Sequence, residues 1–147
     1  MSEILKKIID YLNKNNLDKA YELCQKNVEN KIKHIISNIK GVILFKQQKF
    51  ELAKIEFLRS IETDKNFIDP HKNLFKLNLK IKDFSSAIEN GKKVIELDGQ
   101  KNPVSYFNLA LAYDLNKEYK RAIELYKTAE ISNFKEKKIL FNCRWTP

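Results

Sequence analysis

The segment YKRAIELY, residues 119–126, has the pattern of an amphipathic helix, with Tyr119, Ala122 and Tyr126 on one face. Residues three and four apart are neighbours on a helix surface, so these three side chains form a stripe. Similar segments occur upstream: LDKAYELC at 17–24, FELAKIEF at 50–57 and FSSAIENG at 84–91. A single helix does not require its neighbours to share its pattern. The recurrence therefore indicates a repeated structural unit.

The spacing of these segments defines the repeat. They begin at positions 17, 50, 84 and 119, in steps of 33, 34 and 35 residues, and each has an alanine three residues after its start. A small residue flanked by large ones allows two helices to approach closely. Between the segments we expect further helices at 2–14, 34–47, 69–82 and 103–116. Self-similarity at this period predicts stacked two-helix units that bury their apolar faces against one another.

The composition agrees with an all-helical protein. Hydrophobic residues make up 43% of the 147 residues and charged residues 32%, which is typical of a soluble globular chain. Only three Gly and three Pro are present, whereas a β-sandwich or β-barrel would need turn residues throughout. The amino terminus mixes charges with apolar residues, and no apolar run approaches the roughly 20 residues of a membrane span. We therefore expect a cytoplasmic protein without membrane association.

The formal net charge of +9 raises the hypothesis of nucleic-acid binding. All but three of the 28 basic residues are lysines, however, and acidic residues are interspersed among them along the chain. Nucleic-acid-binding proteins usually concentrate arginine and aromatic residues on one surface. The abundance of Lys, Asn and Ile is also explained by an AT-rich genome. Nucleic-acid binding is therefore the weakest of the functional hypotheses.

The last unit, PVSYFNLALAYDLNKEYKRAIELYKTAEISN at 103–133, resembles the tetratricopeptide repeat family, and the resemblance extends in phase over about residues 2–133. It implies an all-α, right-handed superhelix of about four helix-turn-helix units, near 1–33, 34–67, 68–102 and 103–133. Residues 134–147 would then be a C-terminal capping helix or the start of a truncated fifth repeat. The signature positions of the last unit are occupied by Tyr106, Leu109, Ala110, Tyr113, Tyr119, Ala122, Tyr126 and Ala129.

Several positions depart from the family pattern, which places a small residue on the first helix of a unit and a large one on the second. The four pairs are Ile8 with Cys24, Gly41 with Phe57, Phe75 with Gly91 and Ala110 with Tyr126, so the first and third units reverse the order. We predict that Phe75 fills the space beside Gly91, since cores tolerate changes that conserve volume. Lys40 and Asn78 occupy apolar slots. Lys40 should either extend its ammonium group to solvent or mark a looser contact with the first unit.

No motif for catalysis is present. The glycines at 41, 91 and 99 do not form a phosphate-binding loop, and neither histidine has a second ligand at metal-binding spacing. A metal site built from Cys24, His34, His71 and Cys143 is disfavoured because zinc sites favour ligand pairs close in sequence. The two cysteines are expected to behave as small apolar residues in a reducing compartment. We expect a protein that is not an enzyme and needs no cofactor.

The resemblance implies that the first helices line a concave groove that holds a peptide or a helix of a partner protein. Helical spacing selects the inward-facing residues, and Asn73 and Asn108 are added from the positions where the family contacts peptides. Lysines four residues apart form a row on one helix, which is either a site for an acidic group or an ordinary solvated face. The candidate residues are Leu5, Ile9, Leu12, Ile35, Asn38, Val42, Phe45, Lys72, Asn73, Lys76, Lys80, Val104, Phe107, Asn108, Leu111 and Leu115.

One known use of the family is not expected here. Members that bind the acidic C-terminus of heat-shock chaperones use Lys, Asn and Arg at fixed positions of three successive first helices. The matching residues in units one to three are Leu5, Ile9, Ile39, Asp69 and Asn73, and in units two to four Asn38, Val42, Asn73, Val104 and Asn108. Neither set contains a cation. We predict that an acidic C-terminal pentapeptide does not bind.

The sequence thus favours an adaptor or chaperone-like scaffold whose groove holds an amphipathic, acidic segment of a partner protein. A second hypothesis is self-assembly as a homo-oligomer, in which apolar residues 139–145 dock on the first unit of another copy, over Ile4 and Ile8. The identity of the partner is not encoded in the repeat, because the repeat specifies a shape and the recognition depends on variable side chains.

Overall fold

The computed structural model describes residues 3–26, 30–100 and 102–131, and within these ranges the regular structure is helical, without strands. None of these helices is long and apolar enough to cross a bilayer. The predicted tail at 134–147, including Cys143 and the apolar residues 139–145, lies outside the described residues. The helices are α1 (Glu3–Asn13), α2 (Leu17–Lys26), α3 (Lys33–Lys46), α4 (Phe50–Thr63), α5 (Ile68–Lys80), α6 (Phe84–Leu97), α7 (Pro103–Leu115) and α8 (Tyr119–Ile131), with a 3₁₀ turn, η1 (Asn30–Ile32), before α3.

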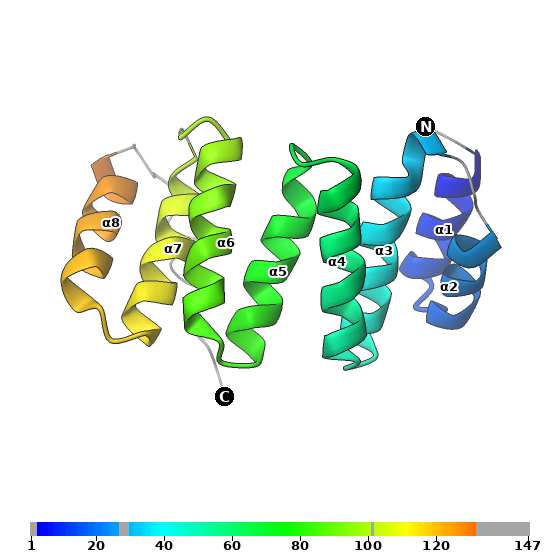
Figure 1. The fold of residues 1–147 in the computed structure, drawn as a ribbon, viewed down its shortest axis with the longest axis horizontal. Coiled ribbons are helices and arrows are strands. Elements are labelled where there is room, and N and C mark those ends of the chain that lie inside the picture. The colour runs from blue at the N-terminus through cyan, green and yellow to red at the C-terminus, as the bar shows by residue number, and fades with distance from the viewer. Residues whose placement is uncertain (1–2, 27–29, 101, 132–147) are drawn as a thin grey trace.

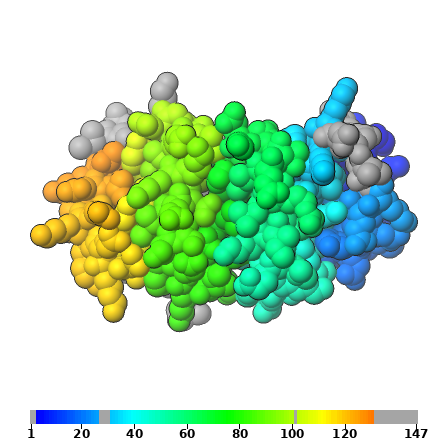
Figure 2. All heavy atoms as spheres, viewed as in Figure 1, coloured from blue at the N-terminus to red at the C-terminus, as the bar shows by residue number. Residues whose placement is uncertain are grey.

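The described helices α1 to α8 form four pairs. The two helices of a pair are antiparallel, and the pairs follow one another along the long axis of the molecule (Figure 1). Each odd-numbered helix packs on the helix that follows it, and each even-numbered helix up to α6 packs on the first helix of the next pair. Figure 2 shows the pairs as successive bands in the order of the chain. This is an all-α repeat solenoid, as predicted. The four helix pairs are called units one to four below.

The two helices of each unit are joined by the same short turn. The residue two positions before the start of the second helix has a positive φ in every unit: Asn15 (54°), Gln48 (61°), Lys82 (63°) and Lys117 (64°). The next backbone N–H reaches back five residues, as from Lys49 to the Leu44 carbonyl at 2.9 Å. This is the hydrogen-bond pattern that closes helix ends around a left-handed residue. The first helices therefore end one or two residues before the limits expected at 47, 82 and 116.

The reversed glycine and phenylalanine positions pack as predicted. Phe75 is 7% exposed, and a Cβ placed on Gly91 would lie 3.3 Å from its Cε2. In unit two, a Cβ on Gly41 would lie 2.5 Å from the ring carbons Cδ1 and Cε1 of Phe57. Units two and three thus each place one phenylalanine ring over one glycine, on whichever helix the glycine lies. The volume-exchange hypothesis is confirmed.

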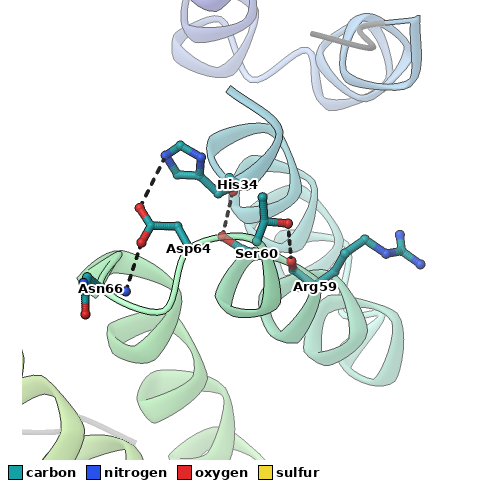
Figure 3. Close-up of polar contacts among 6 residues, drawn as sticks. His34, Arg59, Ser60, Asp64 and Asn66 are labelled. Atoms are coloured by element: carbon teal, nitrogen blue, oxygen red, sulfur yellow. Dashed lines mark hydrogen bonds and ion pairs between the residues drawn. The ribbon is translucent and has the colours of Figure 1, made fainter. Parts of the chain in front are cut away.

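The α3–α4 pair carries polar contacts across its upper end (Figure 3). The Ser60 hydroxyl, which is fully buried, donates a hydrogen bond to the His34 carbonyl at 2.7 Å. The His34 Nε2 lies 4.0 Å from an Asp64 carboxylate oxygen, and the Asn66 N–H donates to that carboxylate. The His34 ring also meets the Phe67 ring edge-on at 5.1 Å. The carboxylate of Asp64 therefore links the end of α4 to both α3 and the turn toward α5.

The two polar residues in apolar slots behave differently. Lys40 is half-buried. Its ammonium group is close enough to Cys24 to lower the pKa of the thiol, which opposes the rise in this pKa caused by burial. Asn78 is 1% exposed, and its side-chain oxygen has no hydrogen-bond partner among the described residues. A buried amide oxygen without a partner destabilises the fold, so Asn78 is a local weak point of unit three.

Candidate functional site

A pocket of about 490 Å³ lies between units three and four. Helix α5 contributes two lysines and two apolar residues, α6 contributes the floor, and α7 with its cap residue Asn102 forms the opposite wall. Five of the predicted groove residues meet here: Lys72, Lys76, Val104, Asn108 and Leu111. The other lining residues are Phe75, Leu79, Gly91, Val94, Asn102 and Ser105.

The floor of the pocket depends on the reversed pair in unit three. Gly91 lies on α6, the helix that faces unit four, and has no side chain to occupy the space between the units. A Cβ added there would lie 3.0 Å from Leu109 Cδ1 and 3.3 Å from Phe75 Cε2. Unit two places its glycine on α3, where Phe57 covers it. The reversal thus removes a side chain from the face between units three and four.

The polar part of the wall is held by the start of α7. The Asn102 side chain accepts a hydrogen bond from the Val104 N–H at 3.0 Å, which caps the helix, and Pro103 occupies its first turn. The Ser105 hydroxyl, buried at 4% exposure, donates to the carboxylate of Asp98. These contacts fix the position of the polar groups relative to the apolar floor.

The charged residues that line the pocket are of one sign. Lys72 is half-buried and Lys76 exposed, and both are lining residues, whereas no Asp or Glu lines the pocket. A concave apolar surface with two ammonium groups at its edge attracts acidic groups and strengthens their interaction by partial desolvation. Lys80 is exposed on the same helix but is not among the lining residues. The lysine row is therefore divided between two pocket residues and one outside it.

Asparagines occur on three first helices, at 38, 73 and 108: Asn73 and Asn108 occupy equivalent positions, and Asn38 lies one residue before the equivalent position of unit two. The Asn73 side chain donates a hydrogen bond to the Asn38 side-chain oxygen at 2.9 Å, which links α5 to α3. Asn38 is 8% exposed, so it acts in packing between units two and three. Asn108 lines the pocket. The sequence pattern did not distinguish these roles.

The structure corrects the prediction for Leu5. It is 6% exposed and belongs to the buried cluster that Ile8, Ala20 and Cys24 form with Ile36 and Ile43 of α3. Of the other candidates, Ile9 is 38% exposed and Leu115 40%, while Leu12, Ile35, Val42, Phe45 and Phe107 are half-buried against the cores or neighbouring rings. None of these residues lines the pocket between units three and four.

Six lining residues were missed by the sequence analysis: Phe75, Leu79, Gly91, Val94, Asn102 and Ser105. The sequence shows that Gly91 and Phe75 depart from the repeat pattern. This departure is the one sequence feature that could have pointed to a pocket here. Its consequence for a pocket was not predictable, because it depends on which side chains of the next unit approach the glycine.

Cys24 and His71 are buried titratable groups outside the pocket whose pKa values are shifted. Burial raises the pKa of the Cys24 thiol to about 11, so it stays protonated at neutral pH and packs as a small apolar side chain. His71 is 8% exposed, with Nδ1 3.4 Å from the Asn90 side-chain oxygen and no partner for Nε2 among the described residues. Burial lowers the pKa of His71. The described residues contain no cluster of three or more His, Cys, Asp or Glu able to hold a metal.

The fold and the pocket define a helical repeat protein of the solenoid class, and comparisons with known proteins identify the type of repeat. Residues 103–130 match the tetratricopeptide repeat family. The crystal structure of MamA has a TM-score of 0.80 at 21% identity, over 92% of this chain and 79% of that one. MamA from Desulfovibrio magneticus RS-1 has a TM-score of 0.77 at 19% identity, over 94% and 80%.

A third similar structure is YrrB, described as a tetratricopeptide repeat protein with an unusual peptide-binding site. Its TM-score is 0.74 at 17% identity, over 90% of this chain and 68% of that one. No curated protein matches the sequence. The last unit therefore matches the tetratricopeptide repeat family in sequence, and the helix pairs as a whole have the fold of these solved repeat structures.

Proposed function

We propose that this protein is an adaptor that binds an amphipathic, acidic segment of a partner protein, with the pocket between units three and four as the central part of the site. The fold supports the general role, since tetratricopeptide repeat proteins are scaffolds for protein–protein interaction. YrrB, which has the same fold, is described as having a peptide-binding site. The observation that carries the proposal is the pocket itself, with its apolar floor, its two lysines and no acidic lining residue.

The chemistry of the pocket selects the ligand. Phe75, Leu79 and Val94 favour an aliphatic or aromatic side chain of the partner, whose burial supplies most of the affinity. Lys72 and Lys76 would pair with a carboxylate next to that side chain, which fixes the register of the segment and accelerates encounter. The amides of Asn102 and Asn108 can bond to the backbone of the segment. These roles require neither a catalytic group nor a cofactor.

Selection from a displayed random-peptide library by the full chain tests this proposal. We expect the selected peptides to place Asp or Glu next to a large apolar residue. Replacing Lys72, Lys76 and Lys80 together by Glu should weaken binding of a selected peptide by at least about tenfold, because like charges would then face each other. The matched control replaces three exposed lysines of second helices, Lys92, Lys120 and Lys127, by Glu and should bind normally.

Two results would contradict the proposal: selected peptides without acidic residues, or equal binding by the pocket variant and the control.

An acidic C-terminal pentapeptide without an apolar residue should not bind in calorimetry. The nucleic-acid hypothesis predicts instead an affinity for oligonucleotides that falls steeply with salt. Titration with an oligonucleotide at low salt separates the two.

A further inference from the structure

Helix α4 presents a row of apolar side chains to solvent. Leu52 is 51% exposed, Ile55 50% and Leu58 43%, and they are spaced three residues apart on one side of the helix. Leu52 also lines a second, smaller pocket of about 350 Å³ with Tyr21 and Leu44, between units one and two. Contiguous exposed apolar residues on a soluble protein usually mark a surface of interaction.

The repeat shows that the scaffold does not require this row. The positions equivalent to Leu52, Ile55 and Leu58 are exposed or half-exposed in the other three units as well. Those units have only polar or charged residues there: Lys19, Glu22 and Gln25 on α2, Ser86, Glu89 and Lys92 on α6, and Arg121, Glu124 and Lys127 on α8. The apolar residues on α4 are therefore a property of unit two alone, and packing within the solenoid does not explain them.

The charges beside the row indicate what covers it. With 3.6 residues per turn, Glu51, Leu52, Ile55, Leu58, Arg59 and Glu62 fall within an arc of about 120° centred near Ile55. Leu52 and Leu58 are each three residues from Ile55, and Glu51 and Arg59 are each four residues from it. The face is therefore complementary to itself when two copies of the helix run in opposite directions.

We propose that α4 packs antiparallel on α4 of a second copy of this chain, around a two-fold axis at Ile55. Leu52 of one copy then lies at the same level as Leu58 of the other, and Glu51 at the same level as Arg59. A parallel pair would instead place Glu51 against Glu51 and Arg59 against Arg59, which is unfavourable. Arg59 is half-exposed, and among the described contacts its guanidinium group bonds only to Glu56 of the same helix, at 2.5 Å, so this group has donors left for a second carboxylate.

The expected dimer is weak. A 14-residue helix is about 21 Å long, and a contact made by one such helix from each copy belongs to the small interfaces, below about 1,200 Å², that are typical of transient complexes. The lysines of the pocket are on α5, a different helix, so self-association and peptide binding are independent proposals. Failure of one does not affect the other.

Sedimentation equilibrium of the full chain, from about 1 μM to about 1 mM, tests the interface, because a weak dimer dissociates within this range. We expect a monomer–dimer equilibrium. Ile55→Glu should weaken the affinity of the dimer at least about tenfold, because the substitution would bury a charged carboxylate at the two-fold axis. Ile123→Glu is the matched control, at an equally exposed apolar residue (53%) on α8. A chain that stays monomeric throughout overturns the proposal, as does an association that responds to Ile123→Glu and not to Ile55→Glu.

A charge exchange tests the antiparallel register. Glu51→Arg and Arg59→Glu, each alone, should weaken the dimer, because each places like charges opposite one another. The two substitutions combined should restore association toward the level of the unmodified chain. If the single variants failed to dimerise because they had lost their fold, combining the two substitutions would not restore association. If the double variant associates no better than the single variants, the register is wrong.

Discussion

In unit two a glycine on the first helix faces a phenylalanine on the second, whereas in unit three the phenylalanine lies on the first helix and the glycine on the second. Both arrangements fill the space within the unit, so the fold accepts either one. They differ in what remains on the surface between units. Gly41 is covered by its own unit, and Gly91 forms part of the floor of the pocket with unit four. A volume exchange that is neutral for the unit thus creates a site between units.

The largest expected effect comes from removing the ring that fills the space at Gly91. Phe75→Ala should lower the free energy of unfolding by about 3–5 kcal/mol, because it leaves a cavity in a core where the neighbouring glycine has no side chain to fill it. Urea denaturation of the purified variant measures this loss. Adding Gly91→Leu to Phe75→Ala should recover part of it, and no recovery would show that the two positions do not share one space.

The two glycines themselves should respond differently to a methyl group. Gly41→Ala should destabilise by about 1–3 kcal/mol, since its Cβ would lie 2.5 Å from the Phe57 ring, which is 1% exposed and has little room to move. Gly91→Ala should stay within about 1 kcal/mol of neutral, because the gain in helix propensity offsets its contacts at 3.0 and 3.3 Å. Thermal unfolding of both variants gives the comparison. Equal losses would contradict it.

The unpaired amide in unit three gives a smaller effect. Asn78 occupies the slot that Leu44 fills in unit two, and its buried oxygen has no partner among the described residues. Asn78→Leu should therefore raise the free energy of unfolding by about 1 kcal/mol. The reciprocal Leu44→Asn is the control and should be destabilising. A loss of stability in Asn78→Leu would mean that the amide has a partner that the described contacts do not include.

The smallest effect is the pH dependence that unit three gains from His71, where unit two has Ser37. Burial lowers the pKa of His71, Lys93 lowers it further to a smaller extent, and Asn90, Glu96 and Lys65 make smaller opposing contributions. The unfolded chain therefore takes up the proton first as the pH falls below the ordinary value of 6.5, and stability decreases from there down to the folded-state pKa. Denaturation between pH 7.5 and about 5 should show a weaker pH dependence in His71→Gln. The His34→Gln control should retain the contribution of His71.

The repeat and the packing within its units could be predicted from the sequence alone. The recurring alanines, the steps of 33 to 35 residues and the Phe75–Gly91 pair all describe contacts between helices close in sequence, which follow from helical periodicity. It identified five of the pocket residues for the same reason, since they lie on predicted faces of two successive first helices. It was wrong for Leu5, because this side chain joins a buried cluster with residues of α2 and α3, and the pattern of α1 alone does not show that cluster.

Periodicity alone thus determined which side of each helix is apolar and that the helices pair and stack. The tertiary structure decided where that stack leaves space and where it leaves apolar side chains uncovered. The pocket between units three and four depends on the distances from Gly91 on α6 both to Phe75 of its own unit and to Leu109 of the next unit. The exposed row on α4 has the same composition as a buried stripe, and only its observed exposure separates the two. Packing depends on side-chain volumes on both sides of a contact, and a pattern within one helix describes only one side.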